Sequence, residues 1–139
     1  MTTAAQTKAK SEKELKNTFC LIKEQDASEA RVLNIKNVSS TSKKTKITGE
    51  GLEKFEITYD PAFNSGSRII SGPTKDNMSY TDSTGLVYDS QDLGGLARFS
   101  IESDADQAVL KGDLENVRLM SSNGKEVVLN GVVWACINK

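Results

Sequence analysis

The sequence predicts an all-β fold, a single antiparallel β-sandwich or small β-barrel of about seven to nine strands. After Asn17, apolar and polar residues alternate with a period of two, which is the pattern of strands that bury one face. Clusters of Gly, Ser, Asn and Pro separate these runs, roughly every 8–12 residues. Val, Ile, Leu and Phe make up 32 of the 139 residues, which suffices for the core of one domain.

The first 17 residues are expected to form a polar, basic and flexible or short-helical segment ahead of a β-domain over 18–139. Met1 to Lys10 has no apolar face and is predicted to be disordered. Ser11 and Glu14 have the spacing of a capping box, which predicts a short helix that ends near Asn17. A strand over 18–23 is predicted next, from its compact apolar run. The alternative is that the helix continues, in which case Leu15, Phe19 and Ile22 would share one of its faces.

Two central runs alternate as half-buried strands do. Leu33 and Ile35 define the first run, and Phe55, Ile57 and Tyr59 define the second, which ends at Asp60-Pro61. Between them, Lys43, Lys44 and Lys46 are interpreted as part of a solvated loop. With so few aromatic residues near these lysines, no nucleic-acid partner is predicted.

The C-terminal third predicts a three-stranded meander over about 96–103, 107–121 and 125–137. Asn123-Gly124 predicts a type I′ hairpin turn, in which both central residues have a positive φ. The inward phase changes near Glu115-Asn116, which predicts a β-bulge or a sharp bend. The last strand is apolar on both faces, so we expect it to be central or buried between layers, with Trp134 in the core.

Cys20 and Cys136 could form one disulfide or remain two buried thiols. We predict the disulfide, which would join the first and last strands and imply an oxidising compartment. The predicted location is therefore periplasmic or extracellular, and cytoplasmic if the thiols are free. No secretion signal precedes Asn17, so this prediction implies that an export signal is missing from the sequence.

The composition excludes several kinds of chemistry. The chain contains no histidine, which removes Ser-His-Asp and Cys-His catalysis and every histidine-containing metal site. No serine-nucleophile or phosphate-loop motif is present. Aspartate carboxylates are ligands that calcium prefers, but the spacing of the aspartates in this chain does not match an EF-hand loop. We therefore predict no enzyme activity, no metal and no cofactor.

The predicted contact surface is the irregular stretch over 64–95, because long loops in small domains are usually functional. Tyrosine rings beside small polar residues bind well, and acidic loops favour a basic partner. The candidate binding residues are Arg68, Tyr80, Tyr88, Asp76, Asp82, Asp89 and Asp92. The alternative is that this stretch holds two ordinary strands, around Ile69-Ile70 and Leu86-Val87.

These observations favour a non-catalytic module that binds another protein or has a structural role. We expect it to belong to the cell envelope or to be secreted. The alternative is a small barrel that encloses a small apolar or sugar ligand, and a carboxylate-dependent enzyme is a distant third. No membrane span is predicted, because the longest uncharged apolar stretch, 127–137, is too short. A large internal pocket would favour the ligand carrier, whereas a filled core with an exposed apolar patch would favour the protein binder.

Overall fold

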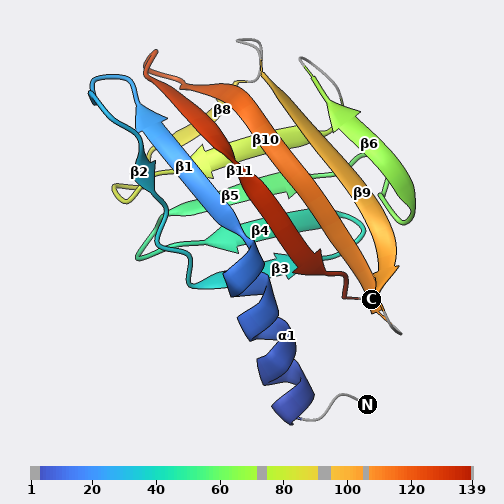
Figure 1. Cartoon of the computed structure of the whole chain (residues 1–139). Helices are drawn as coiled ribbons and strands as arrows, with labels where there is room; N and C mark the ends of the chain where they lie inside the picture. The colour runs from blue at the N-terminus through green and yellow to red at the C-terminus, as the bar shows by residue number, and fades with distance from the viewer. Residues whose placement is uncertain (1–3, 72–74, 91–94, 105–106, 139) are drawn as a thin grey trace.

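A computed structural model describes residues 4–71, 75–90, 95–104 and 107–138. These residues form one helix and eleven strands (Figure 1). The elements are α1 (Ala4–Asn17), β1 (Phe19–Glu24), β2 (Arg31–Val32), β3 (Asn37–Ser40), β4 (Lys44–Thr48), β5 (Lys54–Thr58), β6 (Gly66–Ile70), β7 (Asn77–Thr81), β8 (Val87–Ser90), β9 (Leu96–Asp104), β10 (Gln107–Ser121) and β11 (Glu126–Cys136).

The strands form one sheet, in the order β2-β1-β11-β10-β8-β7-β5-β4-β3. Off this path, β9 pairs with β10, and β6 pairs with β9. The long strand β10 therefore pairs with β9 along its first part and with β8 at its end. Figure 1 shows the sheet curled into a half-barrel, with β1, β11, β10 and β9 in one wall and β3, β4, β5 and β7 in the other. A parallel bridge between Ser40 and Ile137 joins β3 to the end of β11. The predicted all-β class is confirmed.

The core lies between the two walls, because inward positions alternate along each strand. In β5, Phe55 and Ile57 are buried while Lys54, Glu56 and Thr58 are not. The largest side chains with less than 2% exposure come from both walls and include Tyr80, Phe55, Ile22, Ile47, Ile57, Ile70, Leu110, Leu119 and Leu129. The period-two prediction is therefore confirmed.

The predicted C-terminal meander is confirmed as β9, β10 and β11. The register between β10 and β11 shifts between Leu114 and Val117, and Asn116 has a φ of 49°, so the predicted bulge is present. The hairpin after β10 is also present, but its predicted type I′ turn is wrong. Gly124 has a positive φ of 84° and Asn123 does not. The three residues between Ser121 and Lys125 instead suit a type I turn followed by a left-handed glycine.

The helix α1 begins at Ala4, so the prediction of disorder is wrong for residues 4–10. Ala, Gln, Lys and Glu have high helix propensities, and the end of the helix packs on the sheet. The carboxylate of Glu14 accepts a hydrogen bond from the backbone N–H of Cys136 at 3.0 Å, and Lys10 Nζ donates to Gln107 at 2.7 Å. Glu14 therefore attaches the helix to β11, and it is not part of a capping box at Ser11, which lies inside the helix.

The predicted disulfide is wrong, because Cys20 and Cys136 are both free and buried. Cys20 lies opposite Gly131, and Cys136 is five residues further along β11. At roughly 3.3 Å per residue, this separates the two positions by about 16 Å. A disulfide requires Cα atoms within about 7 Å, so the pair cannot bond in this fold. Burial raises the pKa of Cys20 to about 12, which keeps that thiol protonated.

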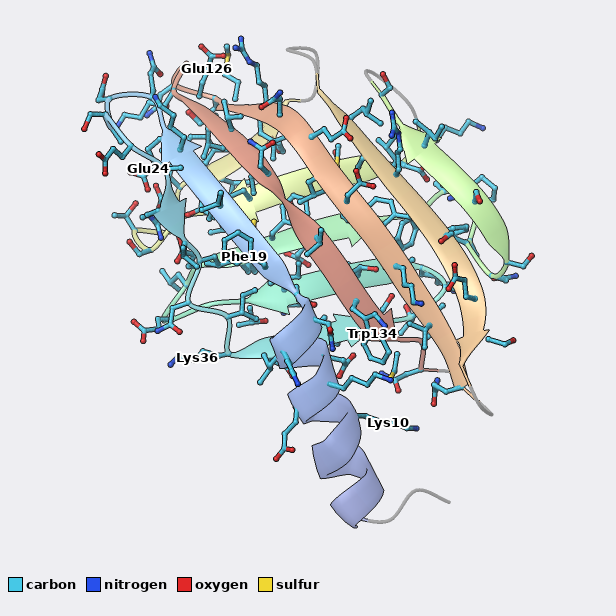
Figure 2. All side chains as sticks on the ribbon, in the orientation of Figure 1. Lys10, Phe19, Glu24, Lys36, Glu126 and Trp134 are labelled. Carbon is cyan, nitrogen blue, oxygen red and sulfur yellow. The ribbon has the colours of Figure 1, made fainter. Side chains whose placement is uncertain are left out.

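β11 is central in the sheet as predicted, with β1 on one side and β10 on the other. Its second face is only partly covered, however, and Trp134 is half-buried outside the core. The ammonium of Lys13, from α1, lies 4.8 Å from the centre of the indole ring. Figure 2 shows Trp134 where the helix meets the sheet.

Candidate functional site

The sequence-predicted Arg68 and Asp76 form a structural cluster at one end of the half-barrel. The Arg68 guanidinium lies over the rings of Tyr59 and Phe63, at 5.8 and 4.9 Å from their centres. It also forms an ion pair with Asp76 at 3.0 Å, and Asp76 accepts the backbone N–H of Asp60 at 2.8 Å. Asp76 is buried. These contacts tie β6 to the segments before and after it.

Tyr80 belongs to a second cluster, which the sequence analysis missed. Its ring is fully buried, and its hydroxyl donates to the carboxylate of Glu53, a buried residue. The guanidinium of Arg31 pairs with the same carboxylate and donates to the Tyr80 hydroxyl at 2.9 Å. Burial, followed by the hydrogen bond to Glu53, raises the pKa of Tyr80. This network links β2 at one edge of the sheet to β5 and β7 in the opposite wall.

No local sequence signal marks the Arg31–Glu53 pair. Glu53 follows a Gly-rich turn and resembles any solvated loop residue, and Arg31 stands in a polar connection. Only the curling of the sheet, which brings the short strand β2 over the end of β5, makes them partners.

Tyr88 and Asp82 lie beside Tyr80. Tyr88 is buried, and its ring centre is 5.8 Å from that of Tyr80. Asp82 organises the turn between β7 and β8, because its Oδ1 accepts the N–H groups of Thr84 and Leu86 at 2.9 and 3.0 Å. Burial raises the pKa of Asp82, but the hydrogen bond from the Thr84 hydroxyl at 2.6 Å and those from the backbone N–H groups outweigh burial, and the net pKa is lowered.

The stretch over 64–95 contains the strands β6, β7 and β8, which matches the alternative of ordinary strands. Asp89 is exposed in β8, and Asp92 lies outside the described residues. The structure brings Tyr80, Tyr88 and Asp82 together at one place and the Arg68–Asp76 pair at another. Both tyrosines bury their rings in the core, so they do not present the aromatic contact surface that the sequence suggested.

Three hollows of about 390, 450 and 480 Å³ lie on the surface or rim of the described part. The second lies between turns and is lined by Glu24, Asp26, Asp82, Glu126, Tyr88 and Lys125, among others. The other two lie over outward-facing residues of β6–β9–β10 and of β4–β5–β7–β8. The inside of the half-barrel is occupied by the large buried side chains described above.

A row of exposed apolar residues crosses the outer face of β2, β1 and β11. Phe19 lies opposite Val132, and their exposed fractions are 45% and 48%. Leu21, two residues further along β1, lies opposite Val32, which is 57% exposed. Facing residues of an antiparallel pair share one side of the sheet, so these four side chains form one surface, here called the apolar stripe. Figure 2 shows Phe19 on this wall, close to the end of α1.

Comparisons of the chain with protein-family models, curated proteins and solved structures found no match. Within the described residues, no group of three or more Cys, Asp and Glu side chains is arranged to hold a metal ion. The described helix is neither long enough nor apolar enough to cross a membrane.

Proposed function

We propose that the chain is a non-catalytic module that binds another protein through the apolar stripe. The observation that carries this proposal is the alignment of Phe19, Val132 and Val32, each between 45% and 57% exposed, on one wall of a half-barrel whose inward side chains form a buried core. Contiguous exposed apolar side chains on a small domain are typical of interaction sites.

The surroundings of the apolar stripe have the composition of an interface rim. Lys23 follows Leu21 on the same face of β1, and Asp113 lies opposite Val132 on β10. Partner surfaces commonly place a polar, solvated rim around an apolar centre. Full burial of an aliphatic or phenyl side chain contributes about 1.5–3 kcal/mol, so covering the exposed halves of three contributes about 3 kcal/mol. That is enough to anchor a modest interface.

The rival function, enclosure of a small apolar or sugar ligand, requires an internal cavity of several hundred cubic ångströms. Among the described residues, the fully buried rings of Tyr80 and Phe55 and the aliphatic side chains around them pack between the two walls, which supports a packed core. The ligand carrier is therefore the weaker candidate.

The cellular location remains a prediction. The disulfide that motivated an envelope or extracellular location is absent, and free thiols are the condition under which a cytoplasmic location is expected.

Site-specific photocrosslinking in the cells that produce the protein tests this proposal. A photoreactive phenylalanine analogue at position 19 should give a discrete adduct with another protein, and Val132→Glu should abolish that adduct. The matched control carries the analogue at Thr58, an exposed position of β5 in the opposite wall. Equal adducts from both positions, or none from position 19, would contradict a partner at the apolar stripe.

A further inference from the structure

A second outer surface, on the opposite wall, is shaped as a groove. It has a volume of about 480 Å³ and runs over β4, β5, β7 and β8 beneath two hairpin turns. We call it the Leu52–Val87 groove, and the side chains that line it are those of Lys46, Thr48, Leu52, Glu53, Lys54, Thr81 and Val87.

The floor of the groove is a single cross-strand row. Thr48 pairs with Lys54, Lys54 with Thr81, and Thr81 with Val87. Leu52 rises above this row from the turn between β4 and β5, and it packs close to Gly85 in the turn between β7 and β8. The exposed fractions of Leu52 and Val87 are 59% and 43%, so the apolar end of the groove is open to solvent.

The other end of the groove is basic. Lys44 and Lys54 share one carboxylate, that of Glu56, at 3.2 and 3.1 Å. Lys46 lies opposite Glu56 in the register and forms no ion pair within the described residues. Glu53 also lines the groove, but its carboxylate is bound by the Arg31 guanidinium and the Tyr80 hydroxyl. Asp89 lies two residues beyond Val87, at the apolar end. Three ammonium groups thus face one carboxylate near the basic end.

The distance between the two ends sets the spacing of the groups that a ligand must have to contact both. Lys54 and Val87 are two strand spacings apart, which is about 10 Å. An extended polypeptide advances about three residues over that distance. A ligand that uses both ends therefore has an anionic group and an apolar group about three residues apart. A volume of 480 Å³ lies within the range of sites that hold a short chain segment or drug-sized molecule.

We propose that the Leu52–Val87 groove binds an extended acidic segment of a polypeptide. A carboxylate of that segment lies between Lys46 and Lys54, and an apolar side chain about three residues away packs between Leu52 and Val87. The threonine hydroxyls of the floor supply hydrogen bonds to the backbone between them. This site is separate from the apolar stripe, on the other wall, so either proposal can fail without the other.

The test is a titration of the folded, full-length chain, followed by the NMR signals of its backbone amides and methyl groups. The probe is a capped five-residue peptide with glutamate at its first position and leucine at its fourth, separated by glycine and serine. At low salt, the methyl signals of Leu52 and Val87 should shift together with the amide of Lys46. A second peptide with glutamine in place of glutamate should bind at least threefold more weakly, and added salt should weaken only the first.

Two variants localise the binding. The double variant Lys46→Gln/Lys54→Gln should weaken the acidic peptide about tenfold, whereas the matched pair Lys23→Gln/Lys125→Gln, outside the groove, should not. Leu52→Ser, at an exposed turn position, should weaken both peptides. The proposal is overturned by shifts centred elsewhere, by no shift at millimolar peptide, or by equal binding of the two peptides. Binding of decanoate at these methyl groups without binding of the acidic peptide would replace it with a fatty-acid site.

Discussion

Alkaline pH should unfold this protein through groups that the fold keeps protonated. Burial raises the pKa of Cys20 from 9.0 to about 12 and that of Tyr59 from 10.0 to about 12. Burial also raises the pKa of Tyr80 and of Tyr88, the other two tyrosines. A raised folded pKa gives stability that is fully present below the unfolded pKa and is lost as pH rises toward the folded value.

The size of this loss of stability follows from the difference between the folded and unfolded pKa values of each group. Each pH unit between the unfolded and folded pKa values removes about 1.4 kcal/mol per group. From pH 9 to 12, Cys20 removes about 4 kcal/mol, and from pH 10 to 12, Tyr59 removes about 3 kcal/mol. Domains of this kind have unfolding free energies of about 5–15 kcal/mol. We therefore expect unfolding between about pH 11 and 12.

Urea denaturation at pH 8 to 10.5 isolates the contribution of Cys20 to the loss of unfolding free energy, because its thiol ionises in the unfolded chain at a lower pH than the tyrosines do. The wild-type unfolding free energy should fall by about 1 kcal/mol more than that of Cys20→Ala between pH 9 and 10, because the thiol of the unfolded chain is only half ionised at pH 9. Groups common to both proteins cancel in this difference. Absorbance at 295 nm provides the second readout, since tyrosinate should form only as the β-sheet circular dichroism is lost. Parallel stability curves, or a tyrosinate step near pH 10 in folded protein, would refute the reasoning.

Three further substitutions, one of them with a control variant, test the contacts that hold the fold. Arg31→Met should lower the unfolding free energy by about 3 kcal/mol in a urea titration, because it leaves the buried Glu53 carboxylate without a cation and with only the Tyr80 hydroxyl as a donor. The control Glu24→Gln, at the exposed partner of Arg31, should cost less than about 1 kcal/mol. Gly131→Val should cost about 3 kcal/mol, since a Cβ there would stand 2.1 Å from the backbone oxygen of Phe19, and an unchanged melting temperature would contradict this packing. Glu14→Ala should release α1, so its amides should lose protection from hydrogen exchange while those of β10 keep theirs.

The parts of the fold that the sequence predicted are those with strong local signals. The strand of Phe19 to Ile22, the C-terminal meander and the bulge before Val117 each follow from apolar periodicity within a few residues. β4 lacked such a signal, because only one of its two inward residues, Ile47, is apolar. The other, Thr45, is buried through hydrogen bonds to Tyr59 at 2.6 Å and Ser40 at 2.8 Å. Ser40 lies in β3 and Tyr59 directly follows β5, so no local signal marked this strand and Lys44 and Lys46 were interpreted as part of a loop.

The candidate site was harder to predict, because exposure depends on which strands become neighbours. Tyr80 and Tyr88 lie in a Ser-, Thr- and Asp-rich stretch that favoured a contact loop, but alternation turns both rings inward. Val132 stands in a nearly all-apolar strand that favoured burial, but it faces outward. Local composition predicted the opposite exposure in each case, and only the register of the assembled sheet decides it.

The position of α1 explains why the apolar stripe stays uncovered. The Thr18 hydroxyl bonds both the N–H and the carbonyl of Trp134 at 3.1 Å, which fixes where the helix ends and β1 begins. The helix therefore lies beside Trp134, with Lys13 over the indole, and stops before Phe19 and Val132. Leaving these two side chains in water forgoes the free energy of burying them, and neither the core nor the helix uses them. A partner that covers them would recover that free energy, which is the physical reason for proposing a protein contact on this wall.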